Sequence, residues 1–236
     1  MKNVSHWLPT SINCAYRVFS IDEYEESVHS DAALLTLPQS LQNASMERKA
    51  SFCAGRTCAL RALSAAGAEA ISTLDRAADG LPQWPSGWTG SISHAIANQT
   101  GVAIAVVAPC AHASAIAIDC EPIFAIDHAT EIASLIVNST EQRLGERLGY
   151  GHAQWLTMTY SLKETLYKLL YAHVRSFMPF EAAELLSFDA GTGQACLMLS
   201  RDWGDLAAGR RYWLQTRTVS IDVIGDCVLS FALEQA

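Results

Sequence analysis

The chain has 236 residues, half of them hydrophobic, and a formal net charge of −8. This composition excludes a disordered chain, and the acidic balance argues against a general nucleic-acid-binding protein. The seven cysteines are scattered and include no Cys-x-x-Cys pair. We therefore expect reduced thiols in the cytoplasm, without a disulfide framework or a zinc site. The N-terminal segment lacks the apolar run of a secretory signal peptide, which agrees with that compartment.

Residues 1–45 read as short strands and loops, with an acidic patch at residues 22–26. A helix is predicted to begin near Ser45 and to end at about Ala66. Its polar residues are mostly basic: Arg48, Lys49, Arg56 and Arg61. Lys49 and Arg56 are seven residues apart and share one face. In an acidic chain such a stripe indicates a specific anion, for example a phosphate, although a solvated basic face would give the same pattern.

A segment rich in Gly and Pro, residues 79–88, predicts a loop. It leads into Gly90-Ser-Ile-Ser-His94, which we interpret as a strand end with two hydroxyls and an imidazole. All three groups can bond phosphate oxygens. The alternative for His94 is a structural histidine with partners inside the fold.

Residues 101–118 carry no Asp, Glu, Lys or Arg and could be mistaken for a membrane span. Two buried strands, 101–107 and 115–122, joined by a turn explain the run better. Asp119 and Glu121 end the second strand and point the same way, roughly 7 Å apart. Such a pair suits a hard divalent cation such as Mg²⁺. The alternative is a strand whose end extends into solvent, where the sequence Asp-x-Glu is also common.

One helix is predicted for Trp155–Tyr171, since apolar positions recur every three or four residues without Gly or Pro. Glu164 and Lys168 are four residues apart and share a face, which suits a polyanion held through a metal. A solvated ion pair and a capping box from Ser161 to Glu164 are the alternatives. We also predict an amphipathic helix over 130–148, with an inward face of Ile132, Leu135, Ile136, Leu144 and Leu148. A hairpin is predicted over 186–199 and a strand over 212–219. A second hairpin is predicted from segments 221–224 and 227–233, with its turn at Gly225-Asp226.

Four segments occur together in one order: Ala54–Thr57, Gly90–His94, Ile118–Pro122 and Tyr160–Lys168. With them the chain resembles the 4′-phosphopantetheinyl transferase superfamily, and within it the enterobactin synthase component D group. The resemblance is close over residues 46–172 and looser beyond them. It implies an α+β fold of two similar α/β halves, 1–112 and 113–236, related by a pseudo-twofold axis, with the active site in the cleft between them.

The resemblance also implies an activity. The enzyme would transfer the 4′-phosphopantetheine arm of coenzyme A to the acceptor serine of apo carrier proteins and release 3′,5′-ADP. It would need Mg²⁺, with Mn²⁺ possible, and act as a cytoplasmic monomer without nucleic-acid or membrane partners. A metal-dependent phosphohydrolase of nucleotides or coenzyme A, and a non-catalytic carrier-protein binder, are the alternatives.

Site residues follow from the same resemblance. The metal carboxylates would be Asp119, Glu121 and Glu164, and Glu164 would also take the serine proton, with Lys168 as its catalytic partner. Pyrophosphate contacts would come from Lys168 and His94. The further residues implied in coenzyme A binding are Arg48, Arg56, Thr57, Ser93, Asp119 and Lys163.

The chain departs from the family pattern in a few places. Tyr160 stands where Trp or Phe is commonest, and Thr165 stands where Ala or Ser is commonest. Cys120 replaces an Ile, and its side chain should point into the core. Gly80-Leu-Pro82 replaces a Gly-Lys-Pro segment, so another basic residue would have to supply the contact of the missing lysine.

Overall fold

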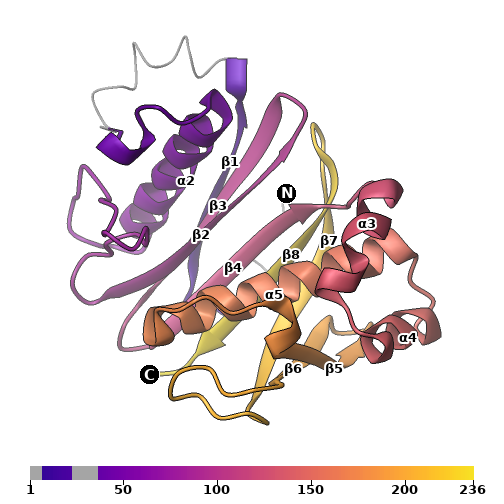
Figure 1. Ribbon diagram of the computed structural model, residues 1–236. Helices are drawn as coiled ribbons and strands as arrows, with labels where there is room; N and C mark the ends of the chain where they lie inside the picture. The colour runs from indigo at the N-terminus through magenta and orange to yellow at the C-terminus, as the bar shows by residue number, and fades with distance from the viewer. Residues whose placement is uncertain (1–6, 23–36) are drawn as a thin grey trace. The chain divides into compact units, whose positions relative to one another are not determined.

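The computed structural model describes residues 7–22 and 37–236. The chain divides into two compact units, which we describe separately. The first comprises residues 1–116, 222–224 and 234–236, and the second comprises residues 117–221 and 225–233. Both contain helices and antiparallel strands, so the predicted α+β class is confirmed (Figure 1).

The first unit contains a three-stranded antiparallel sheet in the order β1-β3-β2. Its strands are β1 (Asn13–Ser20), β2 (Trp88–Ala97) and β3 (Thr100–Pro109), and a 3-10 turn, η2 (Gln39–Leu41), precedes the helix. The long helix α2 (Met46–Ala65) packs on one face of this sheet (Figure 1). Small buried residues of α2 such as Ala54 and Ala59 let it approach β3 closely.

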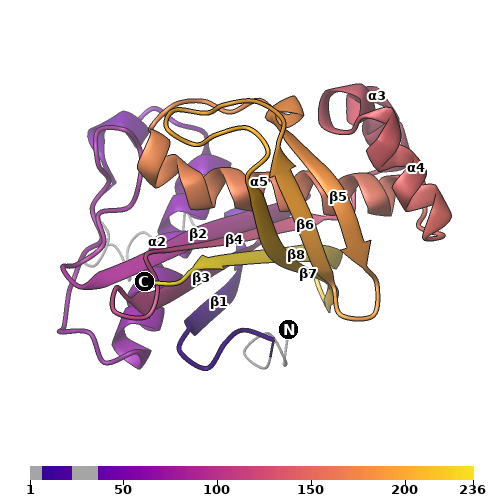
Figure 2. The same ribbon diagram turned by 90° about the horizontal axis from the view of Figure 1, so that it is seen from below.

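The second unit contains a five-stranded sheet in the order β4-β8-β7-β6-β5. Its strands are β4 (Ala115–Pro122), β5 (Ala183–Asp189), β6 (Gln194–Leu199), β7 (Arg211–Ile221) and β8 (Gly225–Glu234). Its helices are α3 (Ile126–Ile136), α4 (Ser139–Arg147) and α5 (His152–Val174), with a short turn η3 (Phe180–Ala182). In Figure 2, α5 lies over the sheet, and α3 and α4 lie near one end of it.

Several predictions from the sequence are confirmed. The uncharged run 101–118 forms the buried strand β3, a turn and the start of β4. Across the described ranges, 7–22 and 37–236, no helix is both long and apolar enough to cross a bilayer. The helices predicted at 45–66 and 155–171 correspond to α2 and α5, and the hairpin at 186–199 is present. The last hairpin turns at residues 222–224 and not at Gly225-Asp226 as predicted, because these two residues pair with Ile221 and Ser220 at the start of β8. Of the acidic patch, residues 23–26 lie outside the described residues.

The single helix predicted over 130–148 is wrong, because the chain breaks there into α3 and α4. The Asn138 side chain accepts hydrogen bonds from the backbone amides of Thr140 and Glu141, and Glu141 accepts one from the Asn138 amide. This capping box starts a new helix. Ile136 is buried and Ile132 packs against the core, as predicted. Leu135 is 67% exposed and Leu148 is 37% exposed, so these two do not face inward.

The alternative of a capping box from Ser161 to Glu164 is excluded. Both residues lie in the middle of α5, where the backbone amides already bond within the helix. The Ser161 hydroxyl instead donates to Asp119 of β4, 2.7 Å away. Ser161 therefore connects α5 to β4 rather than starting a helix.

Candidate functional site

Strand β4 brings Asp119 against helix α5. Asp119 is 1% exposed, and both of its carboxylate oxygens have a partner on α5. Lys168 Nζ donates to Oδ1 over 2.6 Å and also reaches the carbonyl oxygen of Ile118 at 3.3 Å, while Ser161 donates to Oδ2. Cys120, the next residue, is fully buried, as predicted. These contacts fasten β4 to α5 at the point where the sequence predicts a metal site.

Glu121 and Glu164 lie in the same region but have different surroundings. Both are half-buried, and neither carboxylate forms a hydrogen bond or an ion pair with any residue that the structure describes. Burial and the charge of Asp119 raise the pKa of Glu121 to about 8. Burial also raises the pKa of Glu164, although the Lys168 ammonium opposes that effect. The carboxylates of Glu121 and Glu164 are thus partly removed from water and have no hydrogen-bond donor among the described residues, and both lie near the carboxylate of Asp119.

These residues fit a divalent cation. Carboxylate oxygens are the ligands that Mg²⁺ and Mn²⁺ prefer, and a cation would offset the unfavourable burial of Glu121 and Glu164. In the described part of the chain, no three metal-ligating side chains already converge on one point. An ion held by Asp119, Glu121 and Glu164 therefore requires the two unpaired glutamates to turn toward it, which no existing bond prevents.

Lys168 carries a positive charge at this site. Burial alone would lower the pKa of its ammonium, but the carboxylates of Asp119, Glu164 and Glu121 outweigh that effect and raise it. The side chain remains 27% exposed. Lys168 is thus a charged donor within reach of solvent, which suits contact with a phosphate.

Lys163 lies elsewhere. Its side chain is 1% exposed, and Nζ donates to the carbonyl oxygen of Ile136 at 2.6 Å and pairs with Glu141 at 2.8 Å. Glu141 also accepts from the backbone amides of Asn138 and Leu185, each at 2.8 Å. Burial lowers the pKa of Lys163, and Glu141 opposes this effect. The pair joins the end of α3, the start of α4 and β5 to α5, so the geometry favours a structural role.

The first unit contains two neighbouring guanidinium groups. Arg56 of α2 is 5% exposed and stacks over the Phe52 ring, with 4.7 Å from Cζ to the ring centroid. Its Nε has no hydrogen-bond partner in the described ranges. Burial and the charge of Arg76 lower the pKa of Arg56 to about 10, although Asp75 opposes them. A buried, incompletely bonded cation beside a second cation is a favourable place for an anion.

Arg76 was not predicted from the sequence. Its Nε donates to the carbonyl oxygen of Gly80 at 3.2 Å, and NH1 donates to the Ser40 hydroxyl at 3.4 Å. It therefore lies beside the segment in which Leu81 replaces a lysine. The one feature of the sequence that could have indicated this residue is its position, four residues before Gly80 and just before the predicted loop 79–88.

The residues predicted at a strand end lie in the middle of β2 instead. Ser93 is buried and His94 is half-buried, and successive strand residues point to opposite faces. His94 shares its face with Ile92 and Ile96, which pack against the core under α2. Ser93 and His94 therefore point to opposite faces of β2, and His94 is on the α2 side.

Two further predicted residues lie on α2. Thr57 is half-buried, and its hydroxyl donates to the carbonyl oxygen of Cys53 at 2.8 Å, which leaves its oxygen able to accept a bond. Arg48 is exposed in the first turn, where its backbone amide donates to the Ser45 cap. Arg48 and Arg56 are eight residues apart, so they lie on similar sides of the helix.

Comparison with known proteins gives consistent matches. The sequence profile of the 4′-phosphopantetheinyl transferase N-terminal domain matches residues 37–108, and that of the 4′-phosphopantetheinyl transferase superfamily matches residues 115–217. Enterobactin synthase component D of Salmonella typhi is 31% identical over 172 residues, covering 72% of this chain and 69% of that protein. The Escherichia coli K12 protein of that name is 30% identical over 161 residues, covering 67% and 73%. 4′-Phosphopantetheinyl transferase Svp of Streptomyces mobaraensis is 30% identical over 161 residues, covering 68% and 62%.

Replacement of Lys163 tests its structural role. Lys163→Met leaves Glu141 buried without its cation, so the free energy of unfolding should fall by about 3–5 kcal/mol in urea titrations. Lys49→Met, at a half-exposed lysine of α2, is the matched control and should change it by less than about 0.5 kcal/mol. Unchanged stability of Lys163→Met with weakened coenzyme A binding would instead assign Lys163 to the ligand.

The raised pKa values predict how metal binding depends on pH. Below about pH 8 the folded, metal-free protein keeps the Glu121 proton, which a cation must displace. Mg²⁺ should therefore raise the thermal unfolding midpoint more at about pH 8.5 than at about pH 6, measured by calorimetry. Glu121→Gln should reduce the difference, and equal shifts at the two pH values would contradict the account.

Proposed function

The chain belongs to the 4′-phosphopantetheinyl transferase superfamily and is a transferase, and we propose that it modifies apo carrier proteins with the phosphopantetheine arm of coenzyme A. The observation that carries this proposal is the group of carboxylates on β4 and α5, in which Asp119 is fully bonded and Glu121 and Glu164 are not. Such a group supports charge neutralisation at a phosphate and the acceptance of a proton from a nucleophile.

The reaction balances as one displacement. The acceptor serine hydroxyl loses its proton, and its oxygen forms a bond to the phosphorus next to the pantetheine. The bond from that phosphorus to the bridging oxygen of the pyrophosphate breaks, and 3′,5′-ADP leaves with the electron pair. Glu164 is the proposed proton acceptor, because its carboxylate has no donor among the described residues and burial raises its pKa, which makes it a stronger base.

The positive charge that the displacement needs has two proposed sources. Lys168 would donate to the pyrophosphate from its place beside Asp119. Asp119, Glu121 and Glu164 would hold Mg²⁺ or Mn²⁺. When bound, such an ion neutralises the charge that develops on the leaving phosphate. Asp119 is held in place by Lys168 and Ser161, whereas the two glutamates adapt to the ligand.

In the first unit, Arg56 and Thr57 are the proposed contacts for the adenosine end of coenzyme A. The paired guanidinium groups of Arg56 and Arg76 favour a phosphate there, and Arg76 is the best candidate to replace the missing lysine. Arg48 and His94 are further proposed contacts of the same cofactor, whereas Ser93, buried on the opposite face of β2 from His94, is left out. Lys163, which the resemblance included, is left out because its ammonium is enclosed by Glu141 and Ile136.

We also propose which proteins the chain modifies and in which compartment it acts. Relatives named as enterobactin synthase component D indicate carrier domains of siderophore or related peptide assembly as candidate acceptors. We propose that the chain acts on them in the cytoplasm as a monomer, without a nucleic-acid or membrane partner.

The direct test is transfer to a panel of apo carrier proteins, incubated with the chain, coenzyme A and Mg²⁺ and analysed by intact-protein mass spectrometry. At least one carrier should gain the mass of one phosphopantetheine, with one 3′,5′-ADP released for each carrier modified. Steady release of 3′,5′-ADP without a carrier would favour a phosphohydrolase instead. Failure to turn over coenzyme A with any carrier would leave a carrier-binding protein.

Glu164→Gln is the matched variant for the same assay. Loss of the charge and of the basic oxygen should slow transfer by at least ~10²–10⁴-fold, the range for removal of a general base. The thermal midpoint should stay the same or rise, because a half-buried carboxylate without a donor is removed. A near-normal transfer rate would exclude Glu164 as the proton acceptor.

A further inference from the structure

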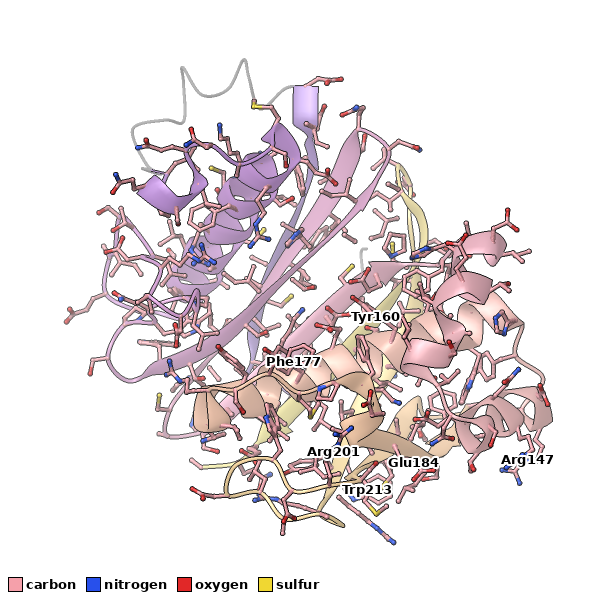
Figure 3. All side chains as sticks on the ribbon, viewed as in Figure 1. Arg147, Tyr160, Phe177, Glu184, Arg201 and Trp213 are labelled. Atoms are coloured by element: carbon pink, nitrogen blue, oxygen red, sulfur yellow. The ribbon has the colours of Figure 1, made fainter. Side chains whose placement is uncertain are left out.

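Tyr160 lies in line with the residues of the carboxylate site. Tyr160, Glu164 and Lys168 are spaced by four residues on α5, so they form a row along one side of the helix. Lys168 fixes the direction of that side, because its Nζ bonds Asp119 of β4. Tyr160 therefore lies one turn before Glu164 on the side that faces β4, where Figure 3 labels it.

The Tyr160 ring is held from two directions. The ring of Phe124, which follows β4, meets it edge to face with 5.3 Å between centroids, and the ring of Phe180 lies 5.2 Å away. Phe124 is itself tied to α5, because its backbone amide donates to the Thr157 hydroxyl at 3.0 Å. The ring is thus placed before any ligand binds, which reduces the entropy cost of using its hydroxyl.

The hydroxyl has acceptors near it but no bond. Apart from burial, the charges that act most strongly on this phenol are Glu164, then Glu121 and Asp119. Yet within residues 7–22 and 37–236 the hydroxyl forms no hydrogen bond, and the side chain is only half-buried. A phenol is protonated at neutral pH and so offers a donor. A fixed, unused donor at the edge of a carboxylate group indicates a contact with a ligand.

We propose that Tyr160 contacts the substrate directly, its hydroxyl donating a hydrogen bond to a phosphate oxygen of coenzyme A at the carboxylate site. This inference rests on the proposed function and adds a binding residue to it. Phosphate is the fitting acceptor, because it brings several strong acceptor oxygens, while the carboxylates next to Tyr160 are the proposed ligands of a cation. Aromatic packing explains the position of the ring but not the unused hydroxyl.

Tyr160→Phe removes the hydroxyl and keeps the ring between Phe124 and Phe180. With saturating Mg²⁺, calorimetric titration should show coenzyme A binding weakened about 10- to 100-fold, the loss expected for one hydrogen bond to a charged group. The affinity for Mn²⁺ alone, measured by electron paramagnetic resonance without coenzyme A, should not change. Tyr150→Phe is the control, because that ring packs on Trp155 and Phe188, and burial rather than a carboxylate of the described residues raises the pKa of its hydroxyl.

The possible outcomes distinguish failure of the Tyr160 contact from failure of the proposed function. If Tyr160→Phe changes Mn²⁺ affinity but leaves coenzyme A affinity as it was, the hydroxyl serves the carboxylates and the inference is wrong. Unchanged values for both ligands overturn it as well, as does an equal loss in Tyr150→Phe. If the wild-type protein binds no coenzyme A, the proposed function fails first and the inference with it.

Discussion

The ion pair between Lys168 and Asp119 joins helix α5 to strand β4, and the carboxylate site depends on it. Asp119 is almost fully buried, and Lys168 and Ser161 stabilise its charge by donating to both of its oxygens. No such donors reach Glu121 and Glu164 from the residues that the structure describes. Asp119 is therefore fixed, whereas Glu121 and Glu164 lack a bonding partner. A divalent cation that also binds a phosphate would provide that partner.

Helix α5 is anchored on a second side by the pair between Lys163 and Glu141. Five residues separate Lys163 from Lys168, which places them about 140° apart around the helix. The first is enclosed among α3, α4 and β5, whereas the second keeps a quarter of its side chain in solvent. This difference in exposure favours different roles: Lys163 holds the helix in place, and we propose that Lys168 also contacts a ligand.

Much of the fold could be predicted because the signals are local. The uncharged run up to Asp119 predicts two buried strands, and the three-four spacing in 155–171 predicts α5. The break between α3 and α4 was missed, although Asn138 followed by Glu141 resembles a capping box. The partners of Lys163 and the placement of Arg76 beside Arg56 could not be predicted, since their contacts join residues 20 to 36 positions apart.

The most direct measurement of the central claim is a crystal structure of the chain with coenzyme A and Mn²⁺, with the ion located by its anomalous scattering. The account predicts an ion bonded to oxygens of Asp119, Glu121 and Glu164 and to the pyrophosphate of coenzyme A. In that structure Lys168 should still contact Asp119. An ion placed away from these carboxylates, or Glu121 and Glu164 left without a ligand, would contradict the account.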